Sequence, residues 1–62
     1  MLSKREKEIL RLMAHNETSA EIGDLLFISS LTAETHKRNI RNKLNVISNF
    51  ELAQYARAFD LI

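Results

Sequence analysis

The chain has 62 residues, a formal net charge of +1, and a composition that is 45% hydrophobic and 27% charged. This length allows a single domain, and such a short chain buries only about 60% of the surface that its unfolded form exposes. There is no cysteine, and the two histidines are far apart, which excludes stabilisation by disulfides or a structural zinc ion. The balance of apolar and charged residues excludes a disordered tail.

Proline is absent and glycine occurs once, at Gly23. Small sheet-rich domains need many tight turns, which usually use both residue types. Their scarcity favours helices with short connections, so we expect an all-α fold with four helices. No apolar run approaches the roughly 20 residues of a membrane span. We therefore expect a cytoplasmic protein without a secretory signal or membrane contact, as the lack of cysteine also favours.

The first predicted helix begins after Ser3, because Ser3 and Glu6 have the spacing of a capping box. Apolar residues follow at helical spacing, which predicts a helix over about 4–14. Asn16 is the kind of left-handed residue that often ends a helix where glycine is absent.

Thr18 and Glu21 repeat the capping box and predict a short second helix over about 19–26. Gly23 lies inside this helix, where glycine costs about 1 kcal/mol relative to alanine. A residue this unfavourable indicates that another helix passes close to the backbone at Gly23.

The third helix is predicted over about 30–44, with Ser29 as its N-cap and Asn45 as the residue that ends it. Ser48 and Glu51 form a third capping box, which opens the fourth helix. The core face of this last helix is predicted to consist of Leu52, Tyr55, Ala56 and Phe59.

On a helical wheel of the third helix, Ala33, Ile40 and Leu44 fall within about 20° of one another and predict a buried stripe. The opposite face carries hydroxyl, amide and guanidinium groups and a leucine, from the residues Leu31, Thr35, Arg38 and Asn42. Arginine can bind guanine through two hydrogen bonds, an amide can pair with adenine, and apolar atoms can contact the thymine methyl group. A basic helix face without any ligand explains the same composition equally well.

The charge distribution and the spacing of the helices favour nucleic acid as the binding partner. Residues 29–47 hold four basic residues against one acidic residue, a net charge of +3. Only residues 27–29 join the second and third predicted helices, and a turn this short is typical of the helix-turn-helix motif. In that motif the second of the two helices, here about 30–44, enters the major groove of double-stranded DNA.

Several stretches of the sequence follow a known pattern together. They read L-S-K-R-E-K-E-I-L-R-L-M-A at 2–14, A-E-I at 20–22, L-F-I-S at 26–29, T-A-E-T-H-K-R-N-I-R-N-K-L-N-V at 32–46 and E-L-A-Q-Y-A-R at 51–57. The chain therefore resembles the LuxR/FixJ/GerE-type C-terminal DNA-binding domain of bacterial transcription regulators, over almost its whole length. The resemblance implies a four-helix fold, a homodimer on DNA, and residues 1–62 as the C-terminal part of a longer regulator.

The wheel and the resemblance together give the expected site residues. We expect base contacts from Glu34, Thr35, Arg38 and Asn42. We expect phosphate contacts from Ser30, Thr32, Lys37, Arg41 and Lys43. The resemblance implies a dimer contact through the fourth helix, for which the expected residues are Ala53, Gln54 and Arg57.

Catalysis is not expected, because the sequence has no nucleophile–base pair, metal-ligand spacing or phosphate-binding glycine loop. We therefore expect no enzyme activity, cofactor, metal or small-molecule ligand in this domain. One other class of function remains open: a helical protein-interaction module, such as a segment like region four of sigma factors, whose partner is RNA polymerase. RNA polymerase is also a further partner to consider for a DNA-binding regulator.

Overall fold

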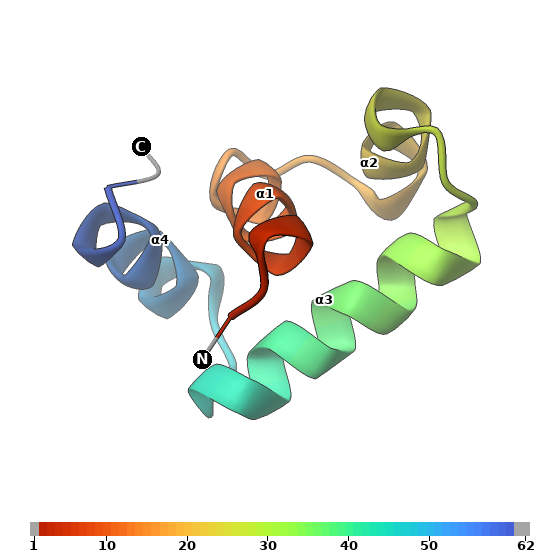
Figure 1. Cartoon of the computed structure of the whole chain (residues 1–62). Helices are drawn as coiled ribbons and strands as arrows, with labels where there is room; N and C mark the ends of the chain where they lie inside the picture. Colours follow the sequence, from red (N-terminus) through yellow and green to blue (C-terminus); the bar gives the residue numbers. More distant parts are fainter. Residues whose placement is uncertain (1, 61–62) are drawn as a thin grey trace.

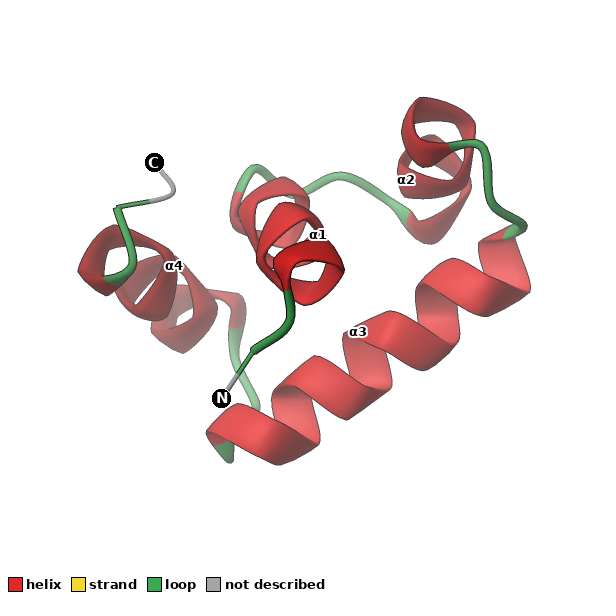
Figure 2. Cartoon of the chain, in the orientation of Figure 1, coloured by secondary structure: helices red, strands yellow, loops and turns green. Residues whose placement is uncertain are grey.

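The computed structural model describes residues 2–60, apart from the side chain at position 49. The four helices are α1 (Lys4–Ala14), α2 (Ser19–Leu26), α3 (Ser30–Leu44) and α4 (Asn49–Ala58). Within the described range the remaining residues are loops and turns, and no strand is formed (Figure 2). The predicted all-α fold and its four helices are confirmed.

The helices are arranged around α1, which lies between α4 and α3 (Figure 1). α4 packs against α1, α3 packs against both α1 and α2, and α2 and α4 lie at opposite ends of the molecule. The turn between α2 and α3 is short, so these two helices form the predicted helix-turn-helix. This arrangement leaves one long side of α3 without a packing partner.

Side chains close to each helix start explain where the helices begin. Both capping boxes at the starts of α1 and α2 are complete, with Ser3 and Thr18 as the N-caps. The third predicted box forms on one side only, since the Ser48 hydroxyl accepts the Glu51 N–H while the Glu51 carboxylate accepts from the N–H of Ile47. Each N-cap replaces one of the hydrogen bonds that a helix start lacks.

The core is small and is formed by all four helices together with residues just outside them. Its buried apolar residues are Leu2, Ile9, Leu10, Met13, Ile22, Ala33, Ile40, Val46, Leu52 and Ala56. Within the predicted stripe of α3, Ala33 and Ile40 are fully buried and Leu44 packs at the edge of the core. The predicted inward face of α3 is therefore confirmed.

The predicted core face of α4 is only half right. Leu52 and Ala56 are fully buried, but Tyr55 and Phe59 remain 38% and 41% exposed. The two rings stack on each other at a centroid distance of 6.4 Å. The reason is that α4 packs mainly against one helix, α1, which covers only the narrow stripe around Leu52 and Ala56.

Gly23 is buried against the turn that follows α2. A Cβ atom placed on Gly23 would lie 2.6 Å from the carbonyl oxygen of Ile28, and 3.4 Å from backbone atoms of Ser29 and Ser30. The Gly23 carbonyl also accepts hydrogen bonds from the N–H groups of Phe27 and Ile28. The close approach inferred from the sequence exists, but the neighbour is the turn and the start of α3 rather than a helix that crosses α2.

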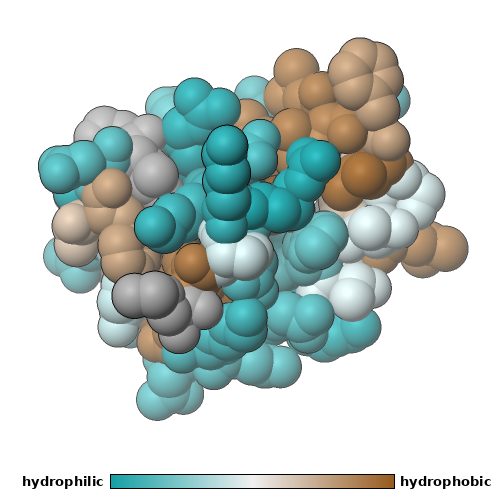
Figure 3. All heavy atoms as spheres, in the orientation of Figure 1, coloured by the Kyte–Doolittle hydropathy of each residue, from teal (hydrophilic) through white to brown (hydrophobic). Residues whose placement is uncertain are grey.

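Phe27 takes an unusual conformation in this turn. Its backbone is left-handed, with φ 58° and ψ 42°, which is uncommon for a bulky residue. Its side chain is 95% exposed. Apolar side chains gather on this side of the molecule, at the α2 end, as Figure 3 shows. Asn16 and Asn45 are also left-handed, as predicted from their positions after helices.

Glu6 connects the start of α1 to the end of α3. Its carboxylate oxygen Oε1 accepts the backbone N–H of Ser3 at 2.8 Å and the Nζ of Lys43 at 2.9 Å. The residue is only 7% exposed. The hydrogen bond from the Ser3 backbone, followed by that from Lys43, lowers the pKa of Glu6 to about 2. Through these two hydrogen bonds the Glu6 carboxylate links the start of α1 to the end of α3.

Replacement of Gly23 by alanine tests the close approach of the turn. Alanine in a helix interior normally stabilises by about 1 kcal/mol relative to glycine. Here the new methyl group would meet the Ile28 carbonyl at 2.6 Å, and overpacking costs about 1–3 kcal/mol. We expect Gly23→Ala to lower the free energy of unfolding by up to about 2 kcal/mol in urea titrations. The exposed neighbour is the control: Asp24→Ala should leave stability equal or slightly higher. Stabilisation by Gly23→Ala would refute the close contact.

Replacement of Glu6 by glutamine tests the ionic link. Glutamine keeps the capping acceptor but removes the charge that faces Lys43, so we expect a loss of about 1–3 kcal/mol at pH 7. Because folding lowers the pKa of Glu6 from 4.5 to about 2, its stabilisation is present above about pH 5 and is lost as the pH falls towards 2. The difference between wild type and Glu6→Gln should therefore narrow steadily over this range in urea titrations. An equal difference at pH 7 and pH 3 would contradict the ionic role.

Candidate nucleic-acid interface

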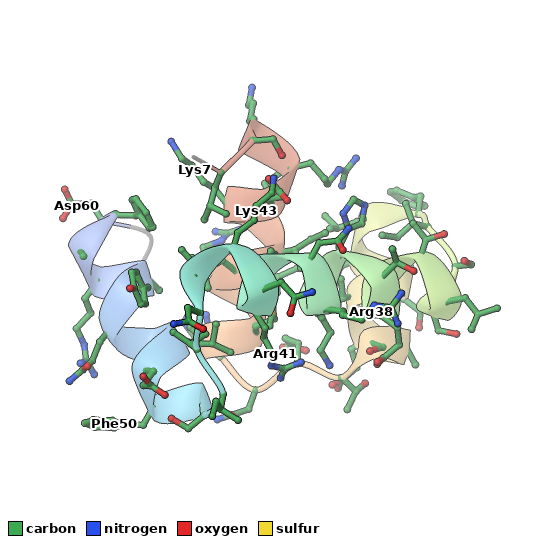
Figure 4. All side chains as sticks on the ribbon, turned by 90° about the horizontal axis from the view of Figure 1, so that it is seen from below. Lys7, Arg38, Arg41, Lys43, Phe50 and Asp60 are labelled. Atoms are coloured by element: carbon green, nitrogen blue, oxygen red, sulfur yellow. The ribbon has the colours of Figure 1, made fainter. Side chains whose placement is uncertain are left out.

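The outward side of α3 presents one row of exposed side chains. Leu31, Thr35, Arg38 and Asn42 are all exposed and follow one another at spacings of four, three and four residues. This spacing aligns residues along one face of a helix. The opposite face holds Ala33 and Ile40, which are fully buried. In Figure 4, which views the molecule from the α3 side, Arg38 lies on this exposed surface.

The row combines different hydrogen-bonding abilities. Arg38 offers a planar group of donors, and the amide of Asn42 both donates and accepts. The Thr35 hydroxyl donates to the Leu31 carbonyl at 3.1 Å, so its oxygen remains as an acceptor. These groups can form directional contacts with base edges in a groove. The structure brings together three of the four residues that the sequence predicts as base contacts.

Glu34, the fourth, lies beside the row and faces α2. Its Oε2 accepts a hydrogen bond from the Ser19 hydroxyl, and Lys37 Nζ lies 3.7 Å from the same oxygen. The hydrogen bond from Ser19, and then the positive charge of Lys37, lower the pKa of the Glu34 carboxyl below its usual value. Glu34 is thus an ionised acceptor at neutral pH that is already engaged with the first helix of the motif.

Lys37 belongs to the same contact between α2 and α3. Its Nζ donates to the Ser19 hydroxyl at 3.2 Å. The side chain is 16% exposed, while that of Glu34 is 59% exposed. The sequence predicts a phosphate contact for Lys37, but in this structure its ammonium group faces the start of α2 and the Glu34 carboxylate.

Arg41 and Lys43 lie on opposite edges of the exposed row. Arg41 borders a hollow of about 450 Å³ next to the loop between α1 and α2, where Glu17 and Glu34 also contribute. Lys43 extends to Glu6 on the other edge and is 48% exposed (Figure 4). The hollow has carboxylates and cations together, so its charge favours no single class of ligand. The two basic groups frame the row of potential base contacts.

The first turn of α3 adds hydroxyl groups. Ser30 and Thr32 are exposed. The Thr32 N–H donates to the Ser29 hydroxyl at 3.0 Å, and the Ser29 hydroxyl in turn donates to Thr32 Oγ1 at 2.9 Å. Free N–H groups and the positive end of the helix dipole make a helix start favourable for phosphate groups. Ser30 and Thr32 lie at this helix start, and their phosphate contacts stay a prediction.

A second surface lies on α4, away from α1. Gln54 and Arg57 are exposed there and Ala53 is half-buried. Sequence reasoning missed Phe50, which is 70% exposed and projects away from the body of the molecule (Figure 4). The signal was available, because Phe50 falls opposite Leu52 and Ala56 on a wheel of α4.

No group of three His, Cys, Asp or Glu side chains within residues 2–60 is placed to hold a metal ion. His15 ends α1, with its Nδ1 2.9 Å from the Arg11 carbonyl oxygen. None of the helices described is long and apolar enough to cross a membrane.

Similar proteins are known from several bacteria. The regulatory protein SdiA of Escherichia coli K12 is 48% identical over 60 residues, which is 97% of this chain and 25% of that protein. The oxygen regulatory protein NreC of Staphylococcus carnosus is 50% identical over 56 residues, 90% of this chain and 26% of that protein. The transcriptional regulatory protein LiaR of Bacillus subtilis is 46% identical over 61 residues, 98% of this chain and 29% of that protein.

The chain thus spans about a quarter to three tenths of the length of these relatives. No solved structure matches it. The luxR family of bacterial regulatory proteins matches residues 1–56. Together with the helix-turn-helix of α2 and α3, these matches confirm the resemblance seen in the sequence: the chain belongs to the luxR family of bacterial regulatory proteins.

Proposed function

We propose that this domain binds double-stranded DNA in a sequence-specific way, with α3 in the major groove. The observation that carries the proposal is the exposed row of α3, in which Thr35, Arg38 and Asn42 stand opposite the fully buried Ala33 and Ile40. Burial of that stripe fixes the rotation of α3, so the polar row is held ready for base edges. A helix whose rotation is already fixed has less backbone freedom to lose on binding.

The groups around the row position the helix on the DNA backbone. Ser30 and Thr32 at the start of α3 donate to phosphates on one wall of the groove, and Arg41 and Lys43 neutralise phosphates along its edges. Lys37 reaches a phosphate after leaving Glu34, an exchange that a nearby anion favours. Each phosphate contact adds affinity without reading sequence.

Glu34 contributes to specificity rather than to affinity. Its carboxylate would repel phosphates, but it can accept a hydrogen bond from the amino group of cytosine. The pKa of Glu34 is lowered, which supports an ionised acceptor at neutral pH. Glu34 therefore favours sites with a cytosine near the α2 side of α3.

In the cell, the domain acts as the C-terminal part of a longer cytoplasmic regulator. Support comes from the relatives, which are all several times longer than this chain. Binding at a promoter changes transcription, with RNA polymerase as the further partner. The domain itself carries out no catalysis and binds no cofactor.

Arg38→Ala tests the base-reading role. A bidentate contact to guanine is worth about 1–3 kcal/mol of discrimination. We expect this variant to lose about 5- to 150-fold in affinity for a site selected from random duplexes. Its affinity for a scrambled duplex should fall much less. The preference at one base position of the selected site should also relax. Since Arg38 is exposed in the free domain, its thermal stability should change by less than about 0.5 kcal/mol.

Arg41→Ala is the matched control on the same helix. If Arg41 contacts a phosphate, Arg41→Ala should lower the affinity for selected and scrambled duplexes by the same factor. Its loss should make the slope of log K against log salt shallower by about 0.9. If Arg38→Ala lost affinity equally on both duplexes, Arg38 would be a phosphate contact, and base reading would have to rest on Glu34 or Asn42. If no sequence were enriched from random duplexes, the domain would not be a sequence-specific DNA binder.

We further propose that two copies pair through α4 on adjacent half-sites, about one helical turn apart. Ala53, Gln54 and Arg57 form the contact, and exposed Phe50 extends it with apolar area. A 62-residue chain offers little surface for a stable pair. The free domain is therefore expected to be mostly monomeric, and the pair forms when DNA brings two copies together.

Gln54→Lys tests this pairing. A lysine near a two-fold axis brings two like charges together, which opposes association. We expect the variant to bind a two-half-site duplex about tenfold more weakly than wild type, a difference of about 1.4 kcal/mol. Both proteins should bind a single half-site equally well, which controls for folding and base reading. Sedimentation of a tight wild-type dimer without DNA would contradict the proposal, and so would binding of the two-half-site duplex by the variant as tightly as by wild type.

A further inference from the structure

Leu31 is an apolar member of an otherwise polar row. It lies in the first turn of α3, between Ser30 and Thr32, and its side chain is 78% exposed. The next residues in the row are Thr35 and Arg38. An exposed leucine here adds nothing to the core, which on α3 is supplied by Ala33 and Ile40. The Leu31 side chain therefore plays no part in the packing of the free domain and is available to a binding partner.

The position of Leu31 makes it part of the reading surface rather than its edge. Three polar residues lie on the same helix face as Leu31: they follow it by four, seven and eleven positions and are Thr35, Arg38 and Asn42. The basic groups of Arg41 and Lys43 lie to the sides of this face. A leucine that follows the row into a groove meets base edges and not phosphate oxygens.

The geometry points to Leu31 as a reader of a methyl group: we propose that it packs against the 5-methyl group of a thymine in the major groove. This inference rests on the proposed function of α3. The thymine methyl is the apolar feature that an unmodified base pair presents in that groove. A leucine side chain has no donor or acceptor, so contact with the other base edges would leave their polar atoms without partners.

The spacing also predicts where this thymine lies. Leu31 precedes Arg38 by seven residues, about 10.5 Å along the helix axis. Successive nucleotides of one DNA strand lie about 3.4 Å apart along the duplex axis. The thymine should therefore lie within about three base pairs of the guanine read by Arg38, on the side of the start of α3.

Deoxyuridine provides the sharpest test, because it differs from thymidine only by the missing methyl group. A site is first selected from random duplexes with the wild-type domain. Each thymine of that site is then replaced in turn by deoxyuridine, and the affinity of wild type, Leu31→Ala and Ile47→Ala is measured for every duplex. Ile47 is a matched control, because it is 89% exposed and lies outside α3.

One replacement should weaken wild-type binding about fourfold, the equivalent of about 0.8 kcal/mol for one buried methyl group. The same replacement should leave the affinity of Leu31→Ala almost unchanged. Ile47→Ala should retain the full fourfold sensitivity, whatever its affinity on the unmodified site. As a second readout, a cytosine placed at that position should bind more tightly when it carries a 5-methyl group, in wild type but not in Leu31→Ala.

The outcomes separate this inference from the proposed function. Enrichment of a site in which no deoxyuridine substitution distinguishes wild type from Leu31→Ala would overturn the role of Leu31 and leave sequence-specific binding intact. An equal loss by Leu31→Ala on selected and scrambled duplexes would overturn it as well, in favour of a non-specific contact. Failure to enrich any site would instead count against the proposed function itself.

Discussion

Burial of one stripe of α3 is the constraint on which the rest of the structure depends. Ala33 and Ile40 are fully buried against the core that α1 organises. Because residues of a helix are fixed at about 100° intervals, this burial decides which side chains face solvent. The row that contains Arg38 is thus a consequence of packing on the other side. The packing that stabilises the small core therefore also sets the orientation of α3.

Local signals in the sequence explain why the helices were predictable. Capping residues such as Ser3 and Thr18 act within one turn, so their spacing fixes the helix starts without tertiary information. The helix ends just before Asn16 and Asn45 follow from the tolerance of asparagine for left-handed backbone. Phe27 gives no such signal, because its left-handed conformation is imposed by the tight turn next to Gly23.

Contacts between distant residues could not be predicted in the same way. The ion pair between Glu6 and Lys43 joins residues 37 positions apart, and the contact of Ser19 with Glu34 spans 15. Sequence spacing places residues on a helix face but does not say which other helix they meet. Part of the basic charge expected to face phosphates is for this reason paired within the free domain. In the proposed complex, DNA phosphates would compete with the carboxylates of Glu34 and Glu6 for Lys37 and Lys43.

The position of α1 has a mechanical consequence for an assembled pair. α4 packs mainly against α1, and α1 in turn packs against α3. Besides the short connection between α3 and α4, the packing path from the outer side of α4 to α3 runs through α1, whose Ile9 and Leu10 are fully enclosed. In the proposed pair, α1 would therefore act as a spacer of fixed thickness, and that thickness would set how much variation in half-site separation the two copies tolerate.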